Sequence, residues 1–479
     1  MKRIFSLLLA ALLMTGALAG CNSDTPADTA DPADTAETTP AETTPAETEP
    51  PVEEKLPYKE PVVAEFDGYT VTLEAPVVVF QGEEGDDAWG HTNFPSVGRT
   101  AEGYLRVSWM YGEDKVGGSG TTYAKISMNE GKSWLPIGSY GSAPSTKMMP
   151  NGKCFSSFIS TGYPKSNDLA AATKPFMDLG TGQSIYFAED LADNGIAKEL
   201  GLLDLSFKEY DPETKTYETV ECTLNWPHAG VLLHHPNNLF GSISQQFGLS
   251  GANVIVAADG TLYTCIYTRG FDSTAATREE AVNDYIKTGC FCVYVFESPD
   301  SGRTWNFLAQ LTPGEEVEDM NAPGFEGYCE PKMIEMPDGS FVMLLRSGGM
   351  TSGTCPIYIT RSEDNCRTWT TPEVFDYCGV LPQLLQLDCG VTVASYGRPD
   401  LFIRTTNDPS GAEWDEHIEI PLASTSRQHT SVSCFYTGMM KLDDTSAWLV
   451  YTDFKYPNRK GVPVKSVILR KIVVTPTEN

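Results

Sequence analysis

Residues 298–305, which read SPDSGRTW, decide the fold, because the same pattern returns three more times along the chain. Residues 127–134 read SMNEGKSW, residues 362–369 read SEDNCRTW, and residues 406–414 read TNDPSGAEW. An Asp or Asn side chain in such a segment can accept hydrogen bonds from turn amides, a Gly can take a left-handed backbone position, and the indole can cover apolar surface. Four copies ending in Trp, in a chain with only 8 Trp, indicate a structural repeat.

Two copies depart from this pattern. Asn129 replaces the Asp in one of them, and Cys366 replaces the Gly in another. We expect Cys366 either to adopt a backbone region that is uncommon for a residue with a side chain or to change the turn.

A second turn signal accompanies the first. From residue 60 onward, short apolar or alternating runs are separated by turn residues, which is typical of β-strands. In several places an acidic or amide residue precedes Gly between two such runs, as tight hairpins require. The six positions are Glu102-Gly103, Asn151-Gly152, Asp259-Gly260, Asp338-Gly339, residues 388–390 and Asp443-Asp444. Six hairpins predict six repeats.

The Trp-ending segments resemble the Asp-box, or bacterial neuraminidase repeat, of the sialidase superfamily, in which each box joins the last two strands of a β-propeller blade. The resemblance implies an all-β, six-bladed, sialidase-like β-propeller with short helical and loop insertions. Combining the two turn signals places the blades at about 76–140, 145–225, 250–312, 328–376, 380–422 and 432–475. The second blade carries no box and much extra sequence at 162–212, and residues 275–286 predict one short inserted helix.

Composition limits the classes of partner. The 479 residues are 41% hydrophobic and 20% charged, as in globular proteins. The formal charge is -30, from 34 Lys and Arg against 64 Asp and Glu. Such a charge repels phosphate backbones and anionic membrane surfaces, so we expect no nucleic-acid partner.

The N-terminus predicts export. Lys2 and Arg3 precede an apolar run at 4–13, and residues 18–21 read LAGC. This layout resembles a bacterial lipoprotein signal peptide over 1–21 with a lipobox, which implies lipidation at Cys21. The alternative is an ordinary cleaved signal with an incidental Cys. We therefore expect an exported protein at the bacterial cell membrane or cell surface, with membrane contact through the lipid anchor only.

A tether separates the anchor from the folded domain. Residues 22–60 are rich in Thr, Pro, Ala and acidic residues, with no aromatic residue before Tyr58. This composition cannot bury enough apolar surface to offset the entropy of ordering, so it predicts a disordered acidic tether. The propeller domain is then expected over 61–479.

The cysteines give a weaker signal. Eleven Cys remain after Cys21, with no CxxC pair and no His partner at zinc spacing. We expect no metal and no cofactor, and most of these thiols to be small buried groups. The disulfide pattern cannot be read from the sequence, and we expect a monomer.

The resemblance implies four site residues, in the family's order. Glu330 opens one strand and Arg346 closes the next, across the Asp338-Gly339 hairpin. Residues 395–400 (SYGRPD) resemble the strand with a further substrate-binding Arg, here Arg398, and residues 435–442 (FYTGMMKL) resemble the segment with the nucleophilic Tyr, here Tyr436.

The chemistry of sialic acids explains these residue types. Their anomeric carbon carries a carboxylate that would repel an anionic nucleophile, whereas a neutral phenol such as Tyr436, activated by Glu330 as base, is not repelled. Arg346 and Arg398 would hold the substrate carboxylate. The resemblance places the acid that protonates the leaving oxygen after the first hairpin, where Glu113 and Asp114 stand. Asp114 is the chosen residue.

One position departs from the family. Sialidases carry an Arg, the first of three that bind the substrate carboxylate, where residues 91–97 here read HTNFPSV, and Asn93 takes that place. An amide has no charge to replace the guanidinium, and losing a charged hydrogen bond costs about 1.5–3 kcal/mol. Either His91 or another Arg substitutes, or the glycan is different.

Three functions remain open. The first is an exo-acting, exo-α-sialidase-like glycoside hydrolase that cleaves terminal, possibly sialic, sugars from a glycan or glycoconjugate. The second is a non-catalytic glycan-binding propeller of a surface lipoprotein. The third is another carbohydrate-active enzyme, a hydrolase or a lyase, on the same fold. Structural roles compete at each position: the Arg residues and Glu330 could be ion-pair partners only, Tyr436 could be a core residue, and Asp114 a loop carboxylate.

Overall fold

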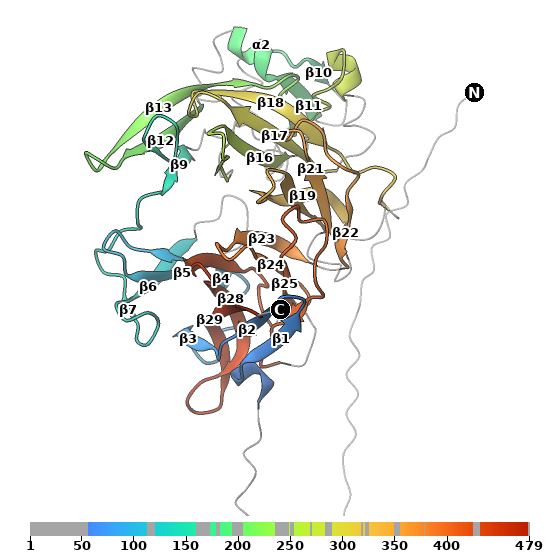
Figure 1. Cartoon of the computed structure of the whole chain (residues 1–479). Helices are drawn as coiled ribbons and strands as arrows, with labels where there is room; N and C mark the ends of the chain where they lie inside the picture. Colours follow the sequence, from blue (N-terminus) through green and yellow to red (C-terminus); the bar gives the residue numbers. More distant parts are fainter. Residues whose placement is uncertain are drawn as a thin grey trace, which may run out of the picture. The chain divides into compact units, whose positions relative to one another are not determined.

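The described residues form a six-bladed β-propeller with few insertions (Figure 1), which confirms the predicted fold class. The computed structural model describes residues 56–112, 120–159, 173–178, 183–193, 205–234, 249, 253–268, 271–282, 290–317, 320, 325–348, 355–377, 379–424 and 432–477. The predicted signal peptide, Cys21 and nearly all of the tether lie outside these residues. No helix in the described ranges has the length and apolarity needed to cross a bilayer.

Blades 1, 4 and 5 are four-stranded antiparallel sheets whose strands follow chain order. Blade 1 contains β4 (His91–Arg99), β5 (Leu105–Tyr111), β6 (Thr121–Ser127) and β7 (Leu135–Pro136); blade 4 contains β19 (Phe325–Glu335), β20 (Phe341–Gly348), β21 (Ile357–Ser362) and β22 (Glu373–Asp376); blade 5 contains β23 (Val380–Gln386), β24 (Thr392–Gly397), β25 (Leu401–Thr406) and β26 (Ile418–Glu419). Both faces of β20 pack against neighbouring blades, so the strand is buried along its whole length, and its first five residues, FVMLL, are apolar.

Blades 2 and 3 are joined into one eight-stranded sheet. Blade 2 contains β8 (Lys147–Met148), β9 (Cys154–Ile159), β12 (Leu205–Asp211) and β13 (Thr216–Asn225); blade 3 contains β15 (Ile255–Val256), β16 (Leu262–Thr268), β17 (Cys292–Ser298) and β18 (Thr304–Leu311). The outer strands β13 and β18 pair in parallel, with Thr223 opposite Thr304. Each therefore covers the other's open edge.

Blade 6 combines the two ends of the chain. Its strands are β27 (Gly438–Asp443), β28 (Ser446–Pro457) and β29 (Pro463–Pro476) from the C-terminal end, and β1 (Val62–Phe66), β2 (Tyr69–Leu73) and β3 (Val77–Gln81) from the N-terminal end. Both β2 and β3 pair with β29. The fully buried Arg470 of β29 reinforces this closure, because its guanidinium donates to the carbonyls of Tyr58, Glu60 and Glu74 at 2.8, 2.8 and 3.1 Å.

This closure corrects one predicted boundary. The first blade begins at His91 and not at residue 76, because β3 belongs to blade 6. The reason is hydrophobic packing: Val79 joins Trp448, Val467 and Leu469 of blade 6 in one buried cluster with blade 1. The sixth blade likewise needs strands that precede the first blade in the chain.

The predicted hairpins join the first two strands of each blade. Their glycines have positive φ angles, from 80° at Gly152 to 91° at Gly390. The first strands of successive blades contact one another around the propeller axis, as β19 does with β23 and β23 with β27. These inner strands therefore set which side chains meet at the centre.

The four Trp-ending segments, hereafter the Trp turns, follow the third strands of blades 1, 3, 4 and 5 and lead into the fourth strands. Asp300 Oδ1 accepts from the amides of Arg303 and Thr304, at 3.1 and 2.8 Å, and Trp305 Nε1 donates to Gly302 O at 3.0 Å. Cys366 has a φ of 64°, so the expected strained backbone is present.

Each Trp turn places its indole against the preceding blade. Trp305 packs with Phe155 and Phe207 of blade 2. The other three are Trp134 against blade 6, Trp369 against blade 3 and Trp414 against blade 4. The Trp turns therefore stabilise the contacts between blades as well as the hairpins.

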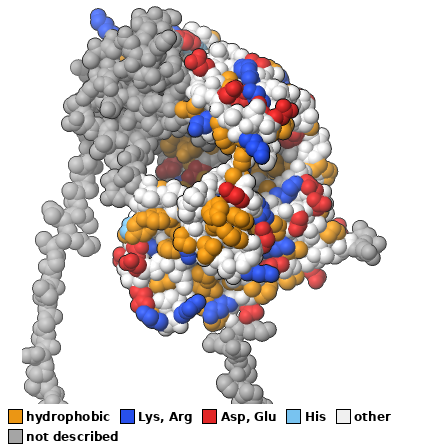
Figure 2. Space-filling view, turned by 90° about the vertical axis from the view of Figure 1, so that its left-hand side faces the viewer, with side chains coloured by type: hydrophobic (Ala, Val, Ile, Leu, Met, Phe, Trp, Pro, Cys, Tyr) orange, Lys and Arg blue, Asp and Glu red, His pale blue; other side chains and the backbone are white. Residues whose placement is uncertain are grey.

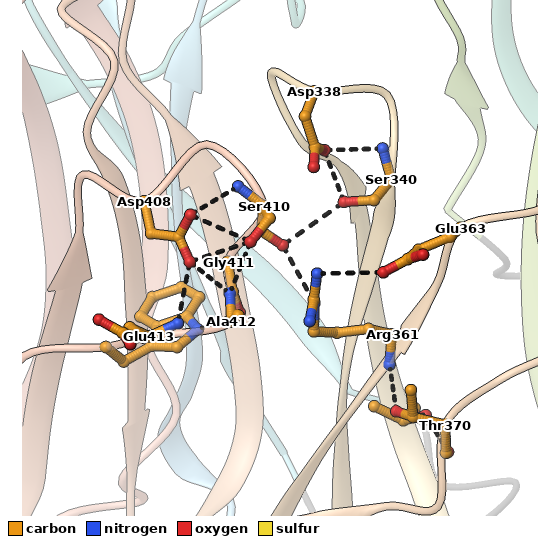
Figure 3. Close-up of polar contacts among 12 residues, drawn as sticks. Asp338, Ser340, Arg361, Glu363, Thr370, Asp408, Ser410, Gly411, Ala412 and Glu413 are labelled. Atoms are coloured by element: carbon orange, nitrogen blue, oxygen red, sulfur yellow. Dashed lines mark hydrogen bonds and ion pairs between the residues drawn. The ribbon is translucent and has the colours of Figure 1, made fainter.

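Figure 3 shows one such contact between blades 5 and 4. Asp408 accepts from the amides of Ala412 and Glu413 and so shapes the turn. The turn's Ser410 carbonyl accepts from Arg361 Nε at 3.1 Å and from the Ser340 hydroxyl at 3.4 Å, both on blade 4. This network ties the turn to the hairpin of the neighbouring blade.

Blade 2 has no Trp turn, so no indole of this kind joins it to blade 1.

The side of the propeller that carries β6 and β13 in Figure 1 is hollowed in Figure 2, with hydrophobic side chains on the rim and acidic side chains inside. Blade 2 carries an extra sheet of β10 (Met177–Asp178), β11 (Gln183–Phe187) and β14 (Gly230–His234) and the helix α2 (Ala188–Asp193).

The predicted helix at 275–286 is helical at 278–282; residues 275–277 precede it without helical structure, and residues 283–286 lie outside the described ranges. A single 3-10 turn, η1 (Pro57–Lys59), precedes β1.

Truncating Trp305 tests the role of the Trp turns. Trp305→Ala removes a fully buried indole between blades 2 and 3, and we expect it to lower the free energy of unfolding by about 3–5 kcal/mol. Denaturant unfolding measures this. The control Leu135→Ala, at a side chain that is 50% exposed, should change it by less than about 0.5 kcal/mol. Equal effects of the two variants would contradict this role.

Candidate active site

Four residues predicted for the pocket converge near the propeller axis. Glu330 lies on β19 and Arg346 on β20, while Arg398 directly follows β24 and Tyr436 precedes β27. These elements belong to blades 4, 5 and 6, whose inner strands contact one another. Segments more than 100 residues apart in the chain thus contribute to one site.

Three of the four residues share one hydrogen-bonded centre. The Tyr436 hydroxyl donates to Glu330 Oε1 at 2.9 Å, and Arg346 Nη1 lies 2.7 Å from the same oxygen. Arg346 Nη1 also donates to the Tyr436 hydroxyl at 3.3 Å. A phenol, a carboxylate and a guanidinium are therefore in mutual contact, in the arrangement of a nucleophile beside its base.

The second oxygen of Glu330 accepts from a backbone amide. Leu381 N–H donates to Glu330 Oε2 at 2.8 Å. With Tyr436 and Arg346, three donors point at this carboxylate, which is the environment of an ionised acceptor.

A repeated backbone feature presents Glu330 to the centre. Phe94, Glu330 and Leu381 each precede a Pro, have positive φ angles of 51°, 45° and 41°, and lie where the pairing of β4, β19 or β23 shifts register. Left-handed backbone is uncommon for such residues and costs free energy. The shift also frees the Leu381 amide from the strand ladder, so that it can donate to Glu330.

The phenol of Tyr436 is held in its neutral form. Burial raises its pKa, and the neighbouring Glu330 charge raises it further, although Arg346 and Arg398 oppose this. The hydroxyl therefore keeps its proton and donates it to Glu330 in the resting site. A base that receives this proton during attack is already in place.

Arg346 is fully engaged by the protein. Besides Glu330 and Tyr436, Nε donates to Gly348 O at 2.6 Å and Nη2 lies 3.7 Å from Glu326 Oε2. Burial alone would lower its pKa, but the Glu330 charge outweighs this and the pKa is raised. Arg346 thus positions Glu330 in this structure.

Arg398 is the cation with free donors. Its side chain is buried, and Nη2 donates to Cys434 O at 3.3 Å. Within the described ranges, its Nε and Nη1 have no hydrogen-bond partner. Burial lowers its pKa, and its guanidinium lies 5.8 Å from the Tyr436 ring centroid. Buried donors without partners are costly, so the site is set up for an acceptor that the protein does not supply.

Asn93 makes no hydrogen bond to Glu330, Arg346, Arg398 or Tyr436. It is fully buried, and its amide atoms have no partner in the part of the chain that the structure describes. The next residue, Phe94, packs its ring 4.9 Å from that of Tyr436. The residue that follows this position therefore presents an aromatic ring to the phenol.

Two further predictions fall outside this geometry. Asp114, predicted as the acid, and its neighbour Glu113 lie outside the described residues. Among described carboxylates, Glu326 is 39% exposed and borders Arg346. No sequence motif pointed to it, although it stands four residues before Glu330. His91 contacts Asp86 at 3.0 Å and stacks on Tyr111. No group of three or more metal-ligating side chains occurs in the described ranges.

Blade 6 holds the segment that carries Tyr436. Ser433 Oγ donates to Thr452 O at 2.6 Å, Cys434 N donates to Thr452 Oγ1 at 3.2 Å, and the hydroxyls of Thr437 and Ser395 lie 2.7 Å apart. The next residue of β28, Asp453, is buried and accepts from the amides of Ala423 and Lys455 at 2.7 and 2.9 Å.

Burial raises the pKa of Asp453 to about 6, although the amides that donate to it oppose this. The folded protein thus favours the protonated carboxyl more than the unfolded chain does.

Comparison with known proteins gives structural likeness only. No family model matches the chain, and no curated protein matches it. It resembles a Dyadobacter fermentans protein described as of unknown function, at 17% identity and a TM-score of 0.49 over 85% of this chain and 99% of that one. It also resembles a Penicillium chrysogenum α-L-arabinanase, at 16% identity and a TM-score of 0.40 over 83% and 98%. A third likeness is to a Trypanosoma rangeli sialidase, at 12% identity and a TM-score of 0.37 over 82% and 57%.

At these identities and TM-scores, the chemistry of the site has to be deduced from the residues of this chain.

Removing the cation that faces Glu330 should destabilise the domain. Arg346→Met leaves a carboxylate that is only 12% exposed without its ion pair, and we expect a loss of about 3–5 kcal/mol in the free energy of unfolding. The double variant Arg346→Met/Glu330→Gln should lose less, because the uncompensated charge is gone. Arg99→Met, in an exposed pair with Glu130, is the control and should cost about 0–1 kcal/mol. A double variant as unstable as the single one would contradict this explanation.

The raised pKa of Asp453 predicts a pH dependence. This group contributes stability that is fully present below its unfolded pKa and is lost as the pH rises through about 6. Between pH 4 and 6.5, the free energy of unfolding of wild type should therefore fall by about 2–3 kcal/mol relative to Asp453→Asn. Denaturant unfolding at the two pH values measures it. Parallel pH profiles of the two proteins would show that this carboxyl does not titrate as stated.

Proposed function

We propose that the protein is an exported, surface-anchored, exo-acting glycoside hydrolase that removes a terminal acidic sugar from a glycan, with Tyr436 as nucleophile and Glu330 as its base. The observation that carries the proposal is the 2.9 Å hydrogen bond from a buried, neutral phenol to a carboxylate that two other donors hold in place. A structural tyrosine needs one acceptor, but it does not need an acceptor that donors from two blades also hold in place.

The reaction follows from this pair. The Tyr436 oxygen attacks the anomeric carbon while Glu330 takes the phenol proton, and the bond to the leaving oxygen breaks as an acid protonates that oxygen. Water then attacks the same carbon, the acid acts as base, and the proton on Glu330 returns to Tyr436. Two inversions give retention at the anomeric carbon. Asp114 is the proposed acid.

Arg398 supports an acidic sugar. Its two unpartnered nitrogens, beside the nucleophile's ring, would donate hydrogen bonds to a carboxylate, and guanidinium binds carboxylates strongly. Arg346 already neutralises Glu330, so a single free cation is left among the described residues of the site. Sialic acid is one candidate. Because Phe94 places a hydrophobic ring, and not a cation, beside Tyr436, the site favours an acidic sugar that does not require three cations.

The second candidate function is glycan binding without turnover. It rests on Asn93, an uncharged residue that is buried where the family resemblance calls for an Arg. Binding and hydrolysis can be separated by experiment.

Hydrolysis of a glycan panel that includes sialosides and other acidic terminal sugars tests the proposal. We expect release of a monosaccharide, and Tyr436→Phe should lower kcat/KM by about a thousandfold or more while glycan binding persists. Tyr377→Phe, at a tyrosine that is 78% exposed, is the control.

Hydrolysis that survives Tyr436→Phe would exclude this nucleophile. Glycan retention without turnover by wild type would favour the binding function, and an unsaturated product would indicate a lyase.

A further inference from the structure

Four aromatic rings, hereafter the aromatic row, cross one face of blade 1. His91 of β4 stacks on Tyr111 of β5, with ring centroids 3.8 Å apart and planes at 19°. Tyr123 of β6 meets Tyr111 edge to face, at 5.7 Å and 81°, and stacks on Trp109 of β5 at 6.5 Å and 20°. Since Trp109 and Tyr111 are two residues apart on one strand, their rings lie on the same face of the blade.

The two tyrosines of the aromatic row are open to solvent. Tyr111 is 37% exposed and Tyr123 is 49% exposed, whereas Trp109 is buried and stacks on Phe80 of β3 at 4.5 Å. On the side of the propeller that carries β6, hydrophobic side chains gather on the rim of the hollow (Figure 2). The row therefore combines a buried base with exposed aromatic rings.

The inner end of the row is fixed by charged groups. Both carboxylate oxygens of Asp86 lie 3.0 Å from His91 Nδ1. The buried Lys465 of β29 lies 3.8 Å from Asp86 Oδ1 and donates to Ala88 O, so it holds the segment that carries this carboxylate. A ligand that stacks on the row finds the rings in position, and binding costs little ordering of the protein.

The aromatic row starts beside the Tyr436 centre. Phe94, whose ring lies 4.9 Å from that of Tyr436, is three residues from His91 on β4. Tyr111 is the last residue of β5, and the proposed acid Asp114 follows it by three residues in the sequence. Since that acid has to contact the leaving oxygen, we expect the sugars beyond the scissile bond at this end of β5.

The chemistry around the row favours a neutral sugar. A pyranose has a face of C–H groups that can pack on an aromatic ring, and hydroxyls that can donate to carboxylates or to water. Residues 83–87 read EEGDD, and this negative charge opposes a second acidic sugar. Two aromatic side chains bury at most about 500 Å², whereas a stable protein interface needs about 800 Å² per partner. A glycan therefore fits the row better than a second copy of the chain does.

We propose that Tyr111 and Tyr123 form a binding position for neutral hexopyranose units of the glycan that lie beyond the scissile bond. One sugar ring stacks on Tyr123, and Tyr111 contacts the sugar that links it to the Tyr436 centre. The role of these sugars as the leaving group rests on the proposed function. Stacking itself requires no catalysis, so it can be measured separately.

Saturation-transfer NMR of the full-length protein with N-acetyllactosamine, a neutral disaccharide, measures this binding. We expect wild type to bind the disaccharide, and Tyr123→Ala and Tyr111→Ala to raise Kd about tenfold. Tyr123→Phe keeps the ring and should bind within about twofold of wild type. The matched control is Tyr217→Ala, because Tyr217 is also 49% exposed but lies on β13 of blade 2. Thermal unfolding of each variant verifies that it is folded.

Kinetics then relate the row to the Tyr436 centre. One substrate carries the acidic sugar on N-acetyllactosamine, and the other is the methyl glycoside of the same sugar. Tyr123→Ala should lower kcat/KM for the first substrate about tenfold more than for the second, because only the first reaches the row. Equal losses for the two substrates would overturn the proposal.

The binding experiment has three further outcomes. Absence of N-acetyllactosamine binding by wild type, or equal losses in Tyr123→Ala and Tyr217→Ala, overturns the proposal. Dimerisation in analytical ultracentrifugation that Tyr123→Ala abolishes would show that a second copy covers the row, and it overturns the proposal as well. Binding through Tyr123 by a protein that hydrolyses no glycoside supports the binding position and excludes only the proposed function.

Discussion

The carboxylate of Glu330 is the interaction on which the site depends. It accepts from Arg346 of its own blade, from the Leu381 amide of blade 5 and from the Tyr436 hydroxyl at the start of blade 6. These three contacts exist only if the blades follow one another around a common axis. Closure of blade 6 by N-terminal strands, with the buried Arg470 holding those strands to β29, is therefore a condition for the chemistry. The positive φ angle of Glu330 costs free energy at this residue, and the contacts with the surrounding blades hold the backbone in this conformation.

Local sequence signals predicted the blades but not every strand pairing. The hairpin glycines and the Trp turns are short-range patterns with a physical reason at each position, so their number and order could be read directly. The contribution of β3 to blade 6 and the parallel pairing of β13 with β18 connect distant segments, and no local pattern encodes such partners. Strands were predictable because short-range patterns encode them. Their partners were not, because pairing depends on segments that are far apart in the chain.

The candidate site divides in the same way. The order of Glu330, Arg346, Arg398 and Tyr436 was expected from a family resemblance, and the structure brings these four residues together. Their contacts were not predictable: Arg346 binds Glu330, and Arg398 alone keeps unpartnered donors. At Asn93 the register shift of β4 buries the amide and turns Phe94 toward Tyr436. Sequence spacing does not reveal such an irregularity within a strand.

In the proposed mechanism, the phenol of Tyr436 becomes covalently bonded to the sugar. Mass spectrometry of the protein after incubation with slowly hydrolysed fluorinated glycosides, followed by peptide mapping, tests it most directly. We expect the added mass of one glycosyl group on the peptide that contains Tyr436, and no added mass in Tyr436→Phe. A glycosyl group on Glu330, or turnover of a glycoside whose intermediate is never found on Tyr436, would contradict it.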